Sequence, residues 1–167
     1  DGLHPMNVGL LNSSQKGVIP CTPRGIISLL KEEGIEITGK HCVVIGRSNL
    51  VGKPMAQLML NENASVTICH SKTRDLAALT RQAEILIIAI GCPNLVTAEM
   101  LKEGAVVIDV GINNVDGKLV GDIYNSIDVS GIEKKAAAIS PVPGGVGPMT
   151  IASLLQNTVD LYKMHIQ

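Results

Sequence analysis

Glycine, hydroxyl and cationic side chains occur together in residues 41–54 (HCVVIGRSNLVGKP), in a pattern that suits phosphate binding. An apolar run leads into a loop bounded by Gly46 and Gly52, and we expect a helix just beyond it. Backbone N–H groups and the positive dipole at the start of that helix could face a phosphate. Arg47 and Ser48 add a cation and a hydroxyl group to the loop. The alternative is an ordinary strand-to-helix turn with a solvated arginine.

A second candidate segment is residues 69–72 (CHSK), at the end of the next expected strand. Proteins that bind NAD on a Rossmann sheet usually carry Asp or Glu there, which bonds to the ribose hydroxyls. Here Ser71 and Lys72 stand instead. A carboxylate would repel a 2′-phosphate, whereas a hydroxyl and an ammonium group, joined by Arg47, would attract it. The segment therefore favours NADP over NAD, and a solvated strand end is the alternative.

Two further segments could approach a flat ring. In residues 108–113 (IDVGIN), Gly111 would allow close backbone approach and Ile112 would form an apolar wall for a nicotinamide. Asp109 is expected to be buried and to accept hydrogen bonds from loop amides rather than to do chemistry. Residues 143–148 (PGGVGP) combine stiff and permissive backbone positions, so this loop could lie against a heterocycle. A linker before the last helix is a compatible interpretation.

Alternating strands and helices are expected to position these segments. The sequence predicts strands at 41–45, 65–69, 84–90 and 105–110. It predicts helices from Thr22–Pro23, with the Thr22 hydroxyl as N-cap, to Gly34 and at 54–61, 75–82, 97–102, 126–137 and after 148. We expect residues 1–22 and the stretch after Gly111 to lack regular structure. This order indicates an α/β fold, a doubly wound and mainly parallel Rossmann-like sheet with flanking helices. Ligands on such sheets bind at the carboxyl ends of the strands.

Composition supports this fold class and excludes several functions. The chain has 167 residues, 46% of them hydrophobic, with two Tyr and no Phe or Trp, so its core must be aliphatic. The net charge of −1 gives no broad basic surface for nucleic acid. No apolar run approaches the roughly 20 residues of a membrane span. The four cysteines are widely spaced, which predicts no metal site and suggests reduced thiols in a cytosol-like compartment.

Taken together and in order, six segments strongly resemble the methylenetetrahydrofolate dehydrogenase/methenyltetrahydrofolate cyclohydrolase family. The resemblance covers the whole chain, and it rests on residues 1–5 (DGLHP), 19–25 (IPCTPRG), 44–48 (VIGRS), 69–72 (CHSK), 107–113 (VIDVGIN) and 141–150 (PVPGGVGPMT). It implies NADP-dependent oxidation of 5,10-methylenetetrahydrofolate, followed by hydrolysis of the methenyl product to 10-formyltetrahydrofolate. Tetrahydrofolate derivatives are the implied ligands, with no nucleic-acid or membrane partner and with a cytoplasmic location.

The resemblance also implies roles for individual residues. The cofactor's phosphates and adenosine ribose would contact Gly46, Arg47, Ser48 and Ser71, and its nicotinamide would lie by Ile112 and Thr150. Asp1 would bind the pterin ring of the folate. The substrate side of the cleft would be lined by Pro143, Gly144, Gly145, Val146 and Gly147.

One departure from the family pattern is large, because the family's general acid/base is a lysine in a Tyr-x-x-x-Lys helix. The fourth residue after Tyr124 is Asp128 and after Tyr162 is Ile166, so we expect no catalytic residue within this chain. The chain also begins without Met, which suggests a fragment. The implied organisation places residues 1–24 and 145–167 in an N-terminal catalytic domain and residues 25–144 in the cofactor domain. Family members are typically homodimers built through the cofactor domain.

Two other functions fit part of the same sequence. A non-catalytic NADP-binding module would also lack the lysine. A dehydrogenase of the shikimate or amino-acid type would share the two-domain plan, but such enzymes lack the loop of residues 143–148 in this setting. In the two-domain organisation that the family resemblance implies, the apolar face of the last helix (Ile151, Leu154, Leu155, Val159, Tyr162) would have lost its partner surface and would be exposed.

Overall fold

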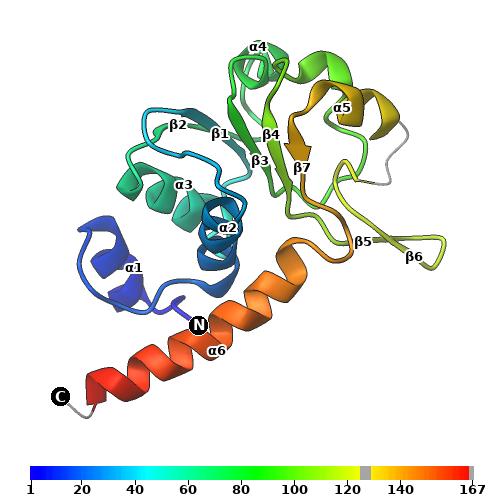
Figure 1. Cartoon of the computed structure of the whole chain (residues 1–167). Helices are drawn as coiled ribbons and strands as arrows, with labels where there is room; N and C mark the ends of the chain where they lie inside the picture. Colours follow the sequence, from blue (N-terminus) through cyan, green and yellow to red (C-terminus); the bar gives the residue numbers. More distant parts are fainter. Residues whose placement is uncertain (125–128, 166–167) are drawn as a thin grey trace.

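The computed structural model describes residues 1–124 and 129–165 (Figure 1). A five-stranded sheet lies at its centre, with helices on both faces and a long final helix extending from the body. In chain order the elements are α1 (Pro5–Asn12), α2 (Cys21–Glu32), β1 (His41–Ile45), α3 (Gly52–Asn61), β2 (Ser65–Cys69), α4 (Leu76–Thr80), β3 (Ile85–Ile88), the 3₁₀ helix η1 (Ala98–Met100), β4 (Val106–Asp109), β5 (Asn113–Val115), β6 (Lys118–Val120), α5 (Val129–Lys135), β7 (Ala138–Ile139) and α6 (Val146–His165).

The sheet has the strand order β2-β1-β3-β4-β7, and every neighbouring pair is parallel. From β1 the chain moves outward to β2, and it then returns to the other side of β1 to form β3. The order therefore reverses between β1 and β3, the position at which ligands bind on doubly wound sheets. Ile45 pairs with both Cys69 and Ile88, so the carboxyl ends of these three strands meet at one edge. The predicted α/β fold is confirmed.

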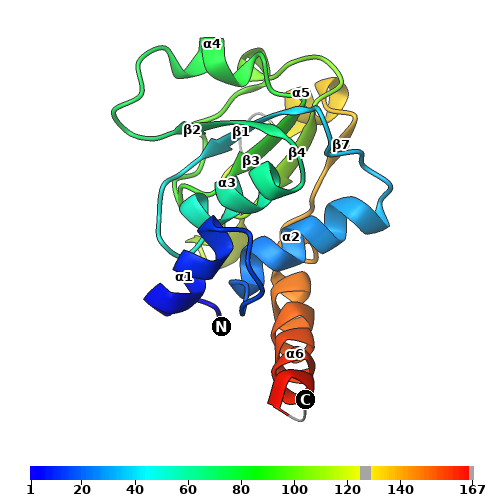
Figure 2. The same ribbon diagram turned by 90° about the vertical axis from the view of Figure 1, so that its left-hand side faces the viewer.

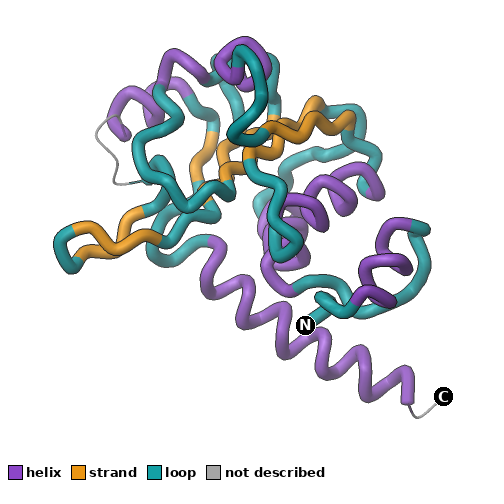
Figure 3. Tube along the Cα trace, turned by 180° about the vertical axis from the view of Figure 1, so that it is seen from behind, coloured by secondary structure: helices purple, strands orange, loops and turns teal. Residues whose placement is uncertain are grey.

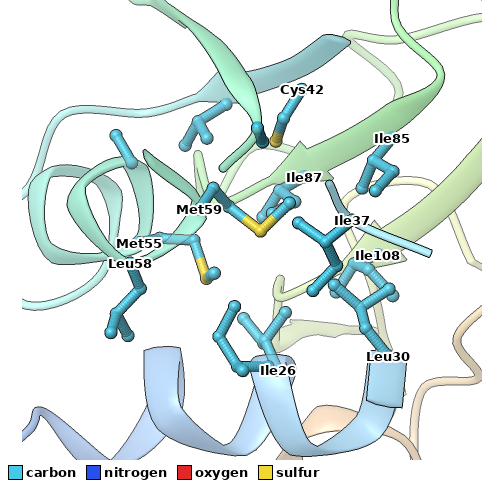
Figure 4. Close-up of a cluster of buried hydrophobic side chains, with 14 of the residues drawn as sticks. Ile26, Leu30, Ile37, Cys42, Met55, Leu58, Met59, Ile85, Ile87 and Ile108 are labelled. Carbon is cyan, nitrogen blue, oxygen red and sulfur yellow. The ribbon is translucent and has the colours of Figure 1, made fainter. Parts of the chain in front are cut away.

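The core consists of two apolar layers, one on each face of the sheet. Successive strand residues point to opposite faces. Cys42 and Val44 face α2 and α3, where they pack with Met55 and Met59 (Figure 4). Val43 and Ile45 belong to the opposite layer, whose other buried residues include Leu86, Ile88, Leu101, Ile123 and Ile132. Continuous apolar strands are typical of sheets covered on both faces.

Several local predictions were wrong, and the N-terminal region gives two of them. Residues 5–12 form α1, although only Leu11 in it is buried. Pro5 in the first turn and the His4 Nδ1, which accepts from the Met6 N–H at 3.2 Å, support the helix start. Helix α2 begins at Cys21 after Pro20 and has no side-chain cap, so Thr22 is not its N-cap.

The stretch after Gly111, expected to lack regular structure, contains the antiparallel hairpin β5–β6. Asp116 and Gly117 both have positive φ angles of 51° and 80°, as a two-residue hairpin turn of the primed type requires. The Asn114 side chain accepts from the Gly117 N–H at 2.9 Å. The hairpin projects from the body beside the sheet (Figure 3). Of the helix expected at 126–137, residues 126–128 lie outside the described residues, and α5 ends at Lys135 before β7.

Helix α6 starts at Val146, inside the segment expected to be a loop, and it packs across α2 (Figure 2). A Cβ on Gly25 would lie 2.8 Å from the Met149 backbone, so glycine allows this close approach of the two helices. The apolar residues predicted to share one face of α6 are exposed, with Ile151, Leu155 and Tyr162 each about two-thirds accessible. Within the described residues, no helix is both long and apolar enough to cross a bilayer.

Candidate functional site

The loops after β1 and β3 pack against each other at the point where the strand order reverses. Gly46 has a φ of 126°, and a Cβ there would lie 2.3 Å from the Ala89 carbonyl oxygen. A Cβ on Gly52 would lie 2.3 Å from the Gly46 carbonyl oxygen. Both positions therefore require glycine, which supports the predicted glycine-bounded loop. The start of α3 is brought directly over the end of β1.

Ser48 occupies the helix start that was predicted to face a phosphate. Its Oγ accepts from the N–H groups of Val51 at 3.1 Å and Gly52 at 3.3 Å. These are amides that lack partners within α3. The hydroxyl proton of Ser48 is not used in these two contacts and can be donated to a ligand. The Arg47 side chain beside it is exposed.

The turn after β2 brings Ser71 to the same edge of the sheet as Arg47. The Gly46 N–H donates to the Cys69 carbonyl oxygen at 2.8 Å, which joins the ends of β1 and β2. A tight turn follows, in which the Thr73 Oγ1 accepts from the His70 N–H at 2.8 Å. The His70 Nδ1 accepts from the Lys72 N–H at 3.1 Å, so the His70 side chain helps to hold this turn. Ser71 and Lys72 are exposed at the tip of the turn.

A cavity of about 500 Å³ lies beside this edge, next to the end of β4. It includes seven of the twelve site residues predicted from the sequence: Ile112, Pro143, Gly144, Gly145, Val146, Gly147 and Thr150. The other five, Asp1, Gly46, Arg47, Ser48 and Ser71, do not line this cavity. Val51, in the loop between β1 and α3, forms part of its wall. A larger cavity of about 790 Å³, mostly apolar, lies between α1, α3 and β2, away from the ends of β3 and β4.

The glycine-rich loop is shaped by its backbone. The Val142–Pro143 peptide bond is cis, and Gly144 has a φ of 105°. A Cβ on Gly145 would lie 2.5 Å from the Pro141 carbonyl oxygen. The Thr150 hydroxyl, one turn into α6, lies 3.1 Å from both the Thr22 Oγ1 and the Val146 carbonyl oxygen. The loop and the starts of α2 and α6 therefore form one side of the cavity.

Asp1 lies next to this cavity but does not line it. Its Oδ1 accepts from the Gly2 N–H at 2.8 Å and from the Cys21 N–H at 2.9 Å. Asp1 thus satisfies a free amide at the start of α2, immediately before Thr22, which does line the cavity. The Asp1 side chain, which the family resemblance predicts to bind the pterin ring, therefore also holds the start of α2 in place.

Asp109, at the end of β4, is completely buried and bonds to loop amides, as expected. Its Oδ1 accepts from the N–H groups of Gly111 and Asp122, both at 2.9 Å. Its Oδ2 accepts from those of Ile123 at 2.9 Å and Tyr124 at 2.7 Å. Burial raises the pKa of the Asp109 carboxyl, and the four backbone donors oppose that rise.

Asp122 is a second buried carboxylate at this edge, and sequence reasoning missed it. Its Oδ2 accepts from the N–H groups of Ile90 at 2.9 Å and Gly91 at 3.0 Å, just after β3. Its Oδ1 accepts from the Asn113 side chain at 3.0 Å. The available signal was a Gly-Asp pair directly after a hairpin whose Asp-Gly turn was also overlooked.

Metal-site geometry is not found in the described part of the chain, where no three His, Cys, Asp or Glu side chains gather as a metal ion would require. Cys21, Cys42 and Cys69 are buried, and Cys92 is exposed. Burial raises the pKa of the Cys42 thiol to about 12, so this group is an unreactive part of the core.

Comparison with known proteins gives consistent matches. The family model for the NAD(P)-binding domain of tetrahydrofolate dehydrogenase/cyclohydrolase matches residues 20–166. The bifunctional protein FolD of Exiguobacterium sibiricum is 56% identical over 98% of this chain, and that of Thermus thermophilus is 52% identical over 96%. The chain spans 57% and 55% of the lengths of these two relatives.

Solved structures agree with the sequence relatives. The bifunctional FolD dehydrogenase/cyclohydrolase of Campylobacter jejuni has a TM-score of 0.94 and 53% identity, covering 99% of this chain and 58% of its own. The Trypanosoma brucei enzyme, solved with NADP and an inhibitor, has a TM-score of 0.89 and 42% identity over the whole of this chain and 59% of its own. A shikimate dehydrogenase of Aquifex aeolicus, with a TM-score of 0.58 and 12% identity, shares the fold alone.

Proposed function

Because this chain belongs to the tetrahydrofolate dehydrogenase/cyclohydrolase family, as its NAD(P)-binding domain, we propose that it binds NADP at the carboxyl ends of β1 to β4. The observation that carries the proposal is the joint position of Arg47 and Ser71 after two paired strands, with no carboxylate at the end of β2. A 2′-phosphate on the adenosine ribose would there meet a guanidinium and a hydroxyl group.

The site residues divide along the sheet edge according to what each can offer. At the β1–β2 end, Gly46, Arg47, Ser48 and Ser71 would contact the phosphates and the adenosine ribose. Ser48 fits this role because its hydroxyl can donate to a phosphate while it accepts from the α3 amides. Further along the edge, Ile112 and Thr150 would lie by the nicotinamide, since both line the 500 Å³ cavity.

The substrate side of this cavity is proposed to be the loop of Pro143, Gly144, Gly145, Val146 and Gly147. Its glycines allow the backbone to approach a flat ring closely. Asp1 is proposed to bind the pterin ring of a tetrahydrofolate derivative. Its Oδ1 is bonded to the start of α2, and a carboxylate has further lone pairs with which to accept from the ring's amino and amide groups.

For the longer protein to which such a domain belongs, we propose the two activities of the family. These are NADP-dependent oxidation of 5,10-methylenetetrahydrofolate and hydrolysis of the methenyl product to 10-formyltetrahydrofolate. Bound NADP would supply the hydride acceptor. The residues of this chain would bind and orient both ligands and exclude water, which is where a dehydrogenase gains much of its rate. The acid/base lysine of the family is not among the 167 residues, so we expect them alone to hydrolyse little methenyltetrahydrofolate.

Residues 1–24 and 145–167 are proposed to pack against the rest of that longer protein. The exposed apolar face of α6 supports this, because such a surface on a single helix normally marks a contact. The proposed boundary at residues 24–25 lies within α2 rather than in a linker. A homodimer built through this domain and a cytoplasmic location remain predictions.

Isothermal titration calorimetry of the purified chain with NADP and with NAD tests the proposal. We expect NADP to bind at least about tenfold more tightly, since hydrogen bonds to a charged group contribute about 1.5–3 kcal/mol. Raising the ionic strength should reduce this preference, because the contacts at the β1–β2 end are exposed. Equal affinity for both dinucleotides, tighter binding of NAD, or no binding of either would contradict it.

A further inference from the structure

Two buried carboxylates hold both ends of the β5–β6 hairpin against the sheet. The hairpin leaves the sheet after Gly111 and returns to it at Gly121, and in Figures 1 and 3 it projects from the body. Asp109 and Asp122 lie at these two ends, and neither has any accessible surface. Their contacts described above are all with amide N–H groups, and neither takes part in an ion pair within the described residues.

The two carboxylates are packed reciprocally against glycines. A Cβ on Gly121 would lie 1.9 Å from the Asp109 Oδ2, and a Cβ on Gly111 would lie 2.4 Å from the Asp122 carboxyl carbon. Each aspartate therefore occupies the space that a side chain on the opposite end of the hairpin would need. The Asp122 N–H also donates to Asp109 at 2.9 Å, so Asp109 fixes the position of Asp122.

Asp122 reaches beyond the hairpin to the loop after β3, here called the β3 loop (residues 89–91). Its Oδ2 accepts from the N–H groups of both Ile90 and Gly91. The β3 loop forms one wall of the crevice where the strand order reverses, because the Ala89 carbonyl oxygen contacts Gly46 at the end of β1. Gly91 has a φ of 64°, so the loop turns sharply at the point where the carboxylate holds it.

We propose that Asp122 is a positioning residue of the cofactor crevice, and that it acts by fixing the β3 loop through the amides of Ile90 and Gly91. The inference rests on the proposed function, since it presumes that a dinucleotide lies over this wall. Because Asp122 itself is buried, it would not contact the dinucleotide directly. It holds the backbone that would contact the middle of the dinucleotide, between the adenosine end at Arg47 and the nicotinamide end at Ile112.

The competing explanation is that Asp122 only anchors the hairpin through Asn113. The two explanations can be tested separately, because the Asp122 Oδ1 bonds to the hairpin and the Oδ2 bonds to the β3 loop. Asn113→Ala removes the contact of the hairpin with Oδ1 and leaves both amides of the β3 loop bonded to Oδ2. Asp122→Ala removes both sets of contacts and leaves two backbone N–H groups without this acceptor, which should allow the β3 loop to move.

The test measures the affinity of the full chain for two ligands by fluorescence or calorimetric titration. NADPH spans the whole crevice, whereas adenosine 2′,5′-bisphosphate would occupy only the β1–β2 end. For Asp122→Ala we expect NADPH to bind about tenfold more weakly than to the unaltered chain, because the β3 loop loses the acceptor that fixes its two amides. The affinity for adenosine 2′,5′-bisphosphate should change by less than about twofold.

Matched variants decide the outcome. Asn113→Ala should bind both ligands like the unaltered chain, and equal losses of NADPH affinity in Asn113→Ala and Asp122→Ala would overturn the inference. A loss of both ligands together in Asp122→Ala would also overturn it, because that pattern indicates general unfolding of the edge. If Asp122→Ala does not fold, Asp122→Asn replaces it. A loss of about threefold for NADPH alone then supports the inference, because a neutral oxygen accepts more weakly than a carboxylate, and unchanged affinity contradicts it.

Failure of the proposed function would look different. In that case the unaltered chain would bind neither NADPH nor adenosine 2′,5′-bisphosphate, before any variant is compared.

Discussion

The two ends of the sheet's carboxyl edge are built in opposite ways. At the β1–β2 end, Arg47 and Ser71 are exposed on tight turns, and their side chains are available to a ligand. At the β3–β4 end, the Asp109 and Asp122 carboxylates are buried and accept hydrogen bonds from amide N–H groups, of which all but the Asn113 side chain belong to the backbone. The first end can therefore select a ligand by charge, whereas the second provides a fixed shape. In the proposed cofactor site, ligand specificity and structural rigidity would therefore be assigned to different ends of one sheet edge.

The buried end depends on how its charges are compensated. A carboxylate removed from water is costly unless hydrogen bonds replace its hydration. Asp109 receives four backbone N–H groups and Asp122 receives two, with a side-chain amide as a third donor. Irregular loops leave such amides without partners in the backbone itself. The two carboxylates therefore supply the hydrogen-bond acceptors that a neighbouring strand would supply within a sheet.

Asp109→Ala is the strongest test of this contrast. The change leaves four buried N–H groups without an acceptor, and we expect the free energy of unfolding to fall by about 3 kcal/mol or more. Urea unfolding followed by circular dichroism measures it. Glu99→Ala, an exposed carboxylate on the 3₁₀ helix, is the control and should change stability by less than about 0.5 kcal/mol. Similar losses for the two variants would show that the buried carboxylate has no special role.

Arg47→Gln probes the exposed end, where we expect the reverse pattern. Stability should stay within about 0.5 kcal/mol of the unaltered chain because the side chain is exposed. The affinity for NADP should fall about 10- to 100-fold, the equivalent of one or two lost charge-assisted hydrogen bonds, while the affinity for NAD changes little. Calorimetric titration with both dinucleotides measures this. Arg81→Gln, at another exposed arginine, should change neither affinity, and an unaltered NADP preference in Arg47→Gln would exclude the proposed contact.

The exposed end and the sheet could be predicted from the sequence, and the buried end only in part. The strands at 41–45 and 65–69 match β1 and β2, because short runs rich in β-branched and apolar residues between turn residues have few alternatives. Once those strands are parallel neighbours, Arg47 and Ser71 must follow at one edge. Asp109 was also interpretable, since a carboxylate that ends a buried strand needs amide donors.

Asp122 could not be found in the same way, because its partners are distant in the chain. It is 31 residues from Gly91, and its position depends on a hairpin whose strands have only three residues each. Strands that short carry no clear alternation of apolar and polar residues. Thr22 shows the same limit, because Pro20 precedes a helix that starts with Asp1 bonded to its first amide. In both cases a tertiary contact overrides a local preference.

Asp160→Asn adds a partly exposed carboxylate for comparison, and its effect should be the smallest. The Asp160 carboxylate on α6 lies 2.8 Å from the Arg24 guanidinium on α2, and the hydrogen bonds from Arg24 and then Gln156 lower the pKa of Asp160 below its ordinary value of 3.8. A lowered folded-state pKa means that the contribution to stability is complete above pH 3.8 and is lost as the pH falls through the folded-state pKa. Asp109 has the opposite sign, because its raised pKa makes its own contribution decline as the pH rises.

We therefore expect Asp160→Asn to lower the unfolding midpoint slightly at pH 7 and to match the unaltered chain in strong acid, because solvent screens this partly exposed ion pair and leaves it a small contribution. Urea unfolding across pH 2 to 7 measures this, and Thr158→Ala, an exposed neighbour on α6, serves as the control without a titrating group. A deficit that persists unchanged in acid would mean that Asp160 acts through packing of α6 on α2 and not through its charge. Exposed and buried carboxylates would then differ only in degree of burial, and the contrast between the two kinds of site would lose its electrostatic basis.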